Sequence, residues 1–132
     1  MRAAIATTLG YAVIVFPLAF IWHLTLFEPL YLRFGYFDGE PNIPLGFLTI
    51  FIQGAMIALL YPHYQPGTSG AKKVARFVLL IGLFHWSLHV LALMAKQNVP
   101  NAMLFLGMES LYLVFQFGLT AIVLFFVHER DH

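Results

Sequence analysis

Apolar and polar positions divide the chain into four long apolar stretches separated by three polar connections. Each stretch has about the length that an α-helix needs to cross the hydrocarbon core of a bilayer. Short connections favour antiparallel neighbours. The pattern therefore predicts an all-α fold, a four-helix transmembrane bundle with up-down-up-down helices, in one domain over residues 1–132. The predicted spans are residues 4–27, 44–61, 74–96 and 102–127.

The longest connection, residues 28–43, mixes aromatic side chains with charged ones. This mixture is typical of the membrane–water interface, where aromatic rings lie among the lipid head groups. We expect a short interfacial helix followed by an irregular loop, with Tyr31, Phe34 and Tyr36 at the interface. At the other end of the chain, residues 128–132 are expected to form a short polar tail without partners for its histidines.

The lysines and arginines favour one orientation in the membrane. If both termini are cytoplasmic, that side holds Arg2, Lys72, Lys73, Arg76 and Arg130, and the other side holds only Arg33 and Lys96. Because cytoplasmic loops are enriched in Lys and Arg, the sequence predicts that the N- and C-termini are both inside.

Composition excludes several classes of protein. Apolar residues make up 61% of the chain and charged residues 10%, too few charges to cover a water-soluble surface. The net charge of +1 and the lack of a basic run argue against nucleic-acid binding. Without cysteine, only His, Asp and Glu remain as strong metal ligands. The sequence also lacks the common hydrolase, zinc-protease and nucleotide-binding motifs, so we lean against an enzyme.

Polar side chains form a layer inside the predicted membrane region. At the rise of about 1.5 Å per helical residue, His23, Gln53, His89 and Glu109 reach a similar depth toward the outer leaflet. His85 lies one turn deeper, near Gln116. His85 and His89 are four residues apart, and Glu109, Tyr112, Gln116 and Thr120 form a stripe at helical spacing. Buried polar groups need partners in a membrane, so we expect the two stripes to face each other.

Four interpretations of this layer stay open. The first is a structural hydrogen-bond network that keeps the helices in register. The second is a divalent transition-metal site formed by His23, His85, His89 and Glu109. The third is a haem held by axial histidines from the set His23, His85 and His89. Proton or lipid chemistry, including quinone binding beside Trp86 and Tyr112, is a further possibility.

Several short motifs resemble a group of small, uncharacterised four-span proteins of bacterial inner membranes. The motifs are Trp22-His23, Pro44-Leu45-Gly46, Gln53-Gly54, Tyr61-Pro62, Ala95-Lys96-Gln97-Asn98 and Glu109-Ser110. The resemblance implies a multi-pass protein of the bacterial inner membrane. It carries over no catalytic residue, because the group has no established activity.

Two functional hypotheses follow. The first is a non-catalytic accessory or assembly subunit of a larger membrane complex, whose partners are the lipid bilayer and other membrane subunits or further copies of the chain. The alternative is a membrane redox protein that binds haem or a metal at the polar layer.

Overall fold

The computed structural model describes residues 1–130, of which the helices account for most, and it contains no strand in that range. Helix α1 (Arg2–Ile21) continues as the π-helical segment η1 (Trp22–Leu26). The short helix α2 (Glu28–Arg33) follows, and then α3 (Ile43–Leu60) with a terminal 3₁₀ turn, η2 (Tyr61–His63). Helix α4 (Ala71–Trp86), the π-helical segment η3 (Ser87–Leu91) and α5 (Ala92–Lys96) are continuous. Helix α6 (Ala102–Leu124) ends in a third π-helical segment, η4 (Phe125–Glu129).

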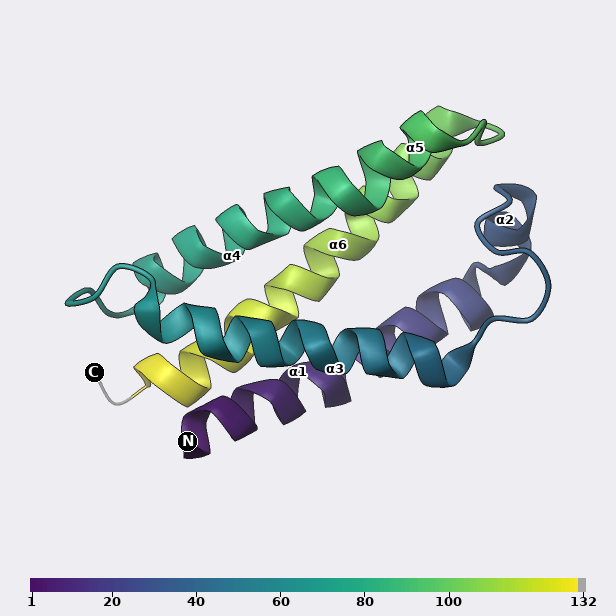
Figure 1. Cartoon of the computed structure of the whole chain (residues 1–132). Coiled ribbons are helices and arrows are strands. Elements are labelled where there is room, and N and C mark those ends of the chain that lie inside the picture. The colour runs from purple at the N-terminus through teal and green to yellow at the C-terminus, as the bar shows by residue number, and fades with distance from the viewer. Residues whose placement is uncertain (131–132) are drawn as a thin grey trace.

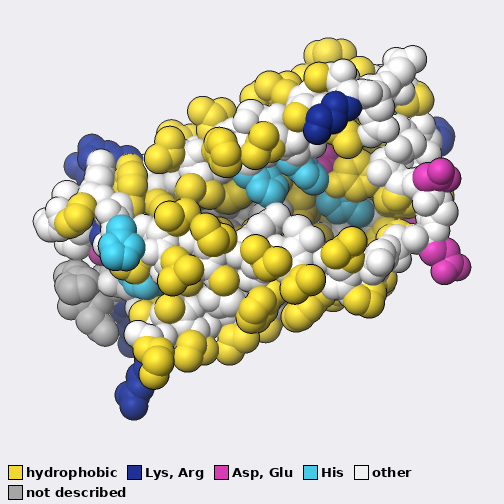
Figure 2. All heavy atoms as spheres, in the orientation of Figure 1, with side chains coloured by type: hydrophobic (Ala, Val, Ile, Leu, Met, Phe, Trp, Pro, Cys, Tyr) yellow, Lys and Arg dark blue, Asp and Glu magenta, His cyan; other side chains and the backbone are white. Residues whose placement is uncertain are grey.

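Four of these helical units are long and apolar enough to cross a membrane. They are Arg2–Leu26, Ile43–His63, Ala71–Lys96 and Ala102–Glu129. In Figure 2 hydrophobic side chains cover the middle of the displayed face, and most of the charged side chains lie near its two ends. This distribution suits a bilayer, which needs an apolar belt between polar ends. The predicted all-α, four-helix membrane bundle is confirmed, and the chain is a small polytopic membrane protein.

The bundle consists of two helix pairs. Helix α3 packs along α1, and α4 packs along α6, while contacts between α1 and α6 join the pairs. Helices α3 and α4 make few or no contacts with each other along their lengths. Figure 1 shows both pairs running between two ends of the molecule. We call them the α2 end, which holds α2 and the 97–101 connection, and the terminal end, which holds the N-terminus, the 64–70 loop and η4.

Local sequence explains how these helices begin and approach each other. The Asn42 side chain accepts a hydrogen bond of 3.0 Å from the Leu45 amide and so caps the start of α3. Gly54 lies where α3 crosses α1, and a Cβ atom there would lie 3.0 Å from the Thr8 carbonyl oxygen. The glycine therefore allows the close backbone approach that small residues provide between membrane helices.

The core has two clusters of buried side chains. One, nearer the terminal end, includes Tyr11, Val15, Tyr61, Phe77 and Leu124. The second, nearer the α2 end, includes Trp22, Tyr31, Val90, Phe105 and Leu113. The second cluster surrounds the polar site described below.

The expectation of a polar tail from residue 128, without partners for its histidines, is wrong for His128. The last helical unit continues through Glu129, and His128 Nε2 lies 2.8 Å from the Thr7 hydroxyl. Glu129 is buried and accepts hydrogen bonds from the Tyr61 hydroxyl and the Gly70 amide, each 2.6 Å long. This carboxylate satisfies an amide at the start of α4 that has no partner within the helix. Asp131 and His132 lie outside the described residues.

Candidate functional site

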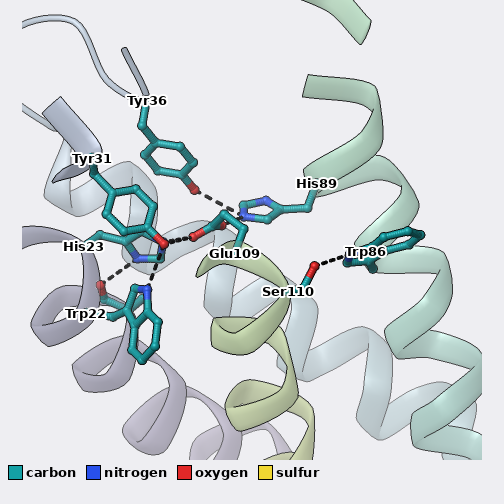
Figure 3. A network of polar contacts seen from close by, with 9 residues as sticks. Trp22, His23, Tyr31, Tyr36, Trp86, His89, Glu109 and Ser110 are labelled. Carbon is teal, nitrogen blue, oxygen red and sulfur yellow. Dashed lines mark hydrogen bonds and ion pairs between the residues drawn. The ribbon is translucent and has the colours of Figure 1, made fainter. Parts of the chain in front are cut away.

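Glu109, on α6, is the centre of the polar site and has no exposed surface. Its Oε1 accepts a hydrogen bond of 2.6 Å from the Tyr31 hydroxyl and lies 2.7 Å from His23 Nε2. Its Oε2 lies 2.6 Å from His89 Nε2. Figure 3 shows the three side chains converging on the carboxylate from three other segments, η1, α2 and η3. Both oxygens of this intramembrane carboxylate are therefore held by donors of the same chain.

Both histidines that contact Glu109 lie in π-helical segments, His23 in η1 and His89 in η3. A π-helical turn replaces i→i+4 bonds by i→i+5 bonds and so changes the direction in which its side chains point. Such turns are frequent at functional sites. The local departure from α-helix is what aims these two imidazoles at one carboxylate.

The hydrogen bonds of His23 determine where its protons are. His23 Nδ1 lies 2.9 Å from the Ala19 carbonyl oxygen, which can only accept, so Nδ1 carries a proton. The contact between His23 Nε2 and Glu109 Oε1 needs a second proton, on either the ring or the carboxyl group. The His23–Glu109 pair thus holds one proton more than a neutral imidazole and an ionised carboxylate would.

Aromatic rings enclose the His23 imidazole on several sides. Tyr36 stacks on it at 5.2 Å between ring centroids, while Tyr31 and Tyr112 contact it edge-on at 4.6 and 4.5 Å. Trp22 completes the enclosure by donating a hydrogen bond of 2.8 Å to the Tyr31 hydroxyl. These rings exclude solvent from the pair, which strengthens its electrostatic interactions.

The expectation that Tyr31 and Phe34 lie among the lipid head groups is wrong. Tyr31 is fully buried and Phe34 is 3% exposed, because the segment after η1 folds back over the bundle. There the Tyr31 hydroxyl reaches Glu109 Oε1 and adds a third donor to those that His23 and His89 supply from the spans. Tyr36 is half-buried, and its hydroxyl lies 3.2 Å from His89 Nε2.

Tyr31 and Tyr36 belong to the 28–43 connection, outside the spans. Burial, and then the negative charge of Glu109, raise the pKa of both phenols well above its ordinary value. Both hydroxyls therefore keep their protons at physiological pH, and Tyr31 remains a donor to Glu109.

His85 does not contact Glu109. Its ring lies 5.3 Å from that of His89 and 5.4 Å from that of Phe117, between ring centroids. No described residue forms a hydrogen bond with either of its ring nitrogens. The predicted ligand set therefore divides into His23, His89 and Glu109, which meet, and His85, which lies beside them.

The two glutamines form a separate hydrogen-bonded group. Gln116 donates a bond of 2.8 Å to the Tyr11 hydroxyl, which donates one of 3.0 Å to Gln53. Tyr112, the remaining member of the predicted polar layer, packs its ring against His23. Sequence reasoning missed Tyr11, although it lies on the first span opposite Gly54. It also missed the hydrogen-bonding roles of Tyr31 and Tyr36.

The two histidine nitrogens that face the centre, His23 Nε2 and His89 Nε2, both contact Glu109, so neither is free for a metal or haem. A metal would have to replace the protons between the two histidines and Glu109. Haem ligation through these two Nε2 atoms would require both rings to leave the carboxylate. Within residues 1–130, no group of three or more His, Asp or Glu side chains is arranged to hold a metal ion.

Comparisons with known proteins give no further assignment: no protein family, no curated protein and no solved structure matches the chain.

Proposed function

We propose that the chain is a non-catalytic accessory or assembly subunit of a larger membrane complex. The observation that supports this best is the completeness of its polar interior. Among the described residues, no buried side-chain nitrogen or oxygen lacks a hydrogen-bond partner. A catalytic centre keeps a reactive group available for its substrate, whereas both oxygens of Glu109 are engaged within the chain.

In this role the Glu109 network fixes the shape of the subunit. It joins η1, α2, η3 and α6 at one point, and polar contacts between membrane helices contribute about 0.6 kcal/mol each on average. A fixed bundle presents fixed outer faces. Those of α3 and α4 carry large exposed apolar side chains that suit lipid or a neighbouring subunit: Ile52, Met56, Leu59, Leu79, Leu80 and Leu83.

Site-directed cross-linking in the native membrane tests the role. The chain contains no cysteine, so single cysteines can be placed without removing any. Leu59→Cys on α3 and Leu79→Cys on α4 are exposed positions, and Val15→Cys, in the core, is the matched buried control. After treatment with a membrane-permeant cross-linker, we expect one stoichiometric membrane-protein adduct at an exposed position and none at residue 15. Recovery of the uncross-linked monomer alone from all three variants would contradict an accessory role.

A metal- or haem-binding redox protein is the second candidate. The observation in its favour is the bond from His23 Nδ1–H to the Ala19 carbonyl. Metal-ligating histidines usually make this kind of bond with their other ring nitrogen. Elemental analysis and an absorption spectrum of the gently solubilised protein test this candidate. Bound metal or a Soret band that is lost in His89→Ala and kept in His63→Ala would support it, and a colourless, metal-free sample would contradict it.

A further inference from the structure

A hollow lies between α3 and α4, on the side where the two helix pairs do not touch. Figure 2 shows a group of histidine side chains in this hollow, midway along the displayed face. They belong to the polar site, because the other described histidines, His63 and His128, lie at the terminal end. His85 and His89 are partly exposed, whereas His23 is buried. The hollow therefore offers two imidazoles to the surrounding membrane.

The depth of His85 makes its lack of a partner significant. His85 precedes Lys96, at the end of the span, by eleven residues. That separation corresponds to about 16 Å of helix, near the middle of a hydrocarbon core of about 30 Å. Hydrocarbon can neither donate nor accept a hydrogen bond, so an unpaired imidazole is unfavourable at this depth. His89 Nδ1 likewise has no partner among the described residues.

We propose that this hollow binds the head group of a membrane-dissolved quinone. Phospholipid head groups remain at the interface, whereas a quinone carries its hydrogen-bonding carbonyl oxygens on an apolar ring that can enter the bilayer interior. An imidazole N–H of His85 can donate to one carbonyl oxygen. The flat rings of His85, His89 and Phe117, with centroids 5.3 and 5.4 Å apart, suit a planar aromatic ligand.

Access and position support the same ligand class. The gap between α3 and α4 opens sideways, so a ligand can enter from the lipid without crossing the polar ends. His89 links the hollow to the interior, since its side chain is 30% exposed and its Nε2 contacts Glu109. This site is independent of the accessory role proposed above, because a subunit with or without partners can hold a quinone there.

A binding titration in nanodiscs tests the proposal. The probe is a benzoquinone with a decyl tail, and quenching of the two tryptophans is the readout. Decylbenzene, which has the same tail and no carbonyl oxygens, is the ligand control. We expect saturable quenching by the quinone only. His85→Phe keeps an aromatic ring and removes the donor, so we expect binding to weaken about fivefold to tenfold. His63→Phe, at an exposed position, should leave binding unchanged.

A second measurement keeps the proposal testable if His85→Phe does not fold. An azidoquinone of the same tail length is photolysed with the wild-type protein, and we expect its label on residues of η3 or the adjoining end of α4. Quenching that does not saturate, or label spread over the lipid-facing helices, would overturn the proposal. A photoreactive residue at position 85 that captures another membrane polypeptide would also overturn it, and would assign the hollow to a partner helix.

Discussion

Glu109 is the residue on which the internal network depends. A carboxylate inside the bilayer is unfavourable unless the protein itself supplies partners, and three side chains meet this need here. His23 and Tyr31 share one oxygen and His89 takes the other. The network is therefore sensitive to the chemical identity of this side chain as well as to its size.

Glu109→Gln keeps the shape of the side chain and places an amide where the histidines meet a carboxylate. We expect the free energy of unfolding to fall by about 1–3 kcal/mol, because charge-assisted hydrogen bonds in the interior are lost. Thermal unfolding in detergent micelles measures the change. Glu28→Gln, at an exposed position, is the control and should change stability by less than about 0.5 kcal/mol. Equal stabilities for the two variants would contradict a central role for Glu109.

The raised pKa values of Tyr31 and Tyr36 predict how stability depends on alkaline pH. In the unfolded chain these phenols lose their protons near pH 10, about the ordinary pKa of tyrosine, and in the folded chain they keep them. Above about pH 10 the unfolded state therefore binds fewer protons than the folded state, and stability falls as pH rises. Tyr31→Phe removes one of these groups and should make the fall less steep. An unchanged slope between pH 9 and 11, measured by thermal unfolding, would contradict this assignment.

Depth and spacing predicted that Glu109 has histidine partners, but they did not select the two that meet it, since His85 belonged to the same candidate set. His23, His89 and Glu109 lie at similar depths, and a buried carboxylate in a membrane needs partners. The tyrosines could not be predicted in the same way. Tyr31 and Tyr36 belong to a connection whose path back over the bundle follows no helical period. Tyr11 was overlooked because one hydroxyl in an apolar span gives no pattern.

At the scale of elements, the rings of His85 and His89 lie 5.3 Å apart, as their four-residue spacing predicts, but only His89 contacts Glu109. Residues four apart share a face of an α-helix, which placed His85 and His89 together toward Glu109. In the structure, η3 begins at Ser87, between the two histidines. The wider turn directs His89 toward the carboxylate and leaves His85 beside it. No local sequence signal distinguishes a π-helical turn from an α-helical one here.

The α1–α3 contact gives a prediction with an internal control. Gly54→Ala would place its Cβ 3.0 Å from the Thr8 carbonyl oxygen and 3.1 Å from the Tyr11 ring, so we expect a loss of about 1–3 kcal/mol. A Cβ at Gly46, on the same helix, meets nothing within 4 Å. Gly46→Ala should therefore stabilise the helix by about 0.5–1 kcal/mol. Thermal unfolding of both variants measures the two changes in stability. A change of the same sign in both variants would show that the packing at Gly54 is not tight.

At the scale of the whole molecule, the two helix pairs place the N-terminus and η4 at the same end, where Thr7 and His128 are in contact. The number of spans and their alternating direction follow from the apolar stretches, and they were predictable for that reason. The absence of close packing between α3 and α4 was not predictable, because both helices carry exposed apolar side chains and α3 has no strongly polar residue other than Gln53 to select a neighbour.

The charge distribution predicts that the terminal end is cytoplasmic. Reporter fusions test this orientation. Green fluorescent protein joined to the C-terminus should fluoresce, and alkaline phosphatase inserted after Asn98, in the connection between α5 and α6, should be active. In the control fusions the reporters change places. Alkaline phosphatase at the C-terminus should be inactive, and green fluorescent protein after Asn98 should not fluoresce. Phosphatase activity at the C-terminus would reverse the orientation.

The contacts of Glu129 also impose an order in time. A ribosome synthesises Glu129 after Tyr61, Gly70 and Lys73, which are its contacts. The 64–70 loop and the start of α4 therefore lack this carboxylate until the last helical unit has been made. The terminal end is thus closed late in synthesis, when all four spans exist. A chain ending at Val127 should insert normally but be cut by protease in the 64–70 loop, whereas residues 1–132 carrying Arg130→Ala should resist. The same carboxylate that caps a helix would then close the terminal end only once the fourth span has been made.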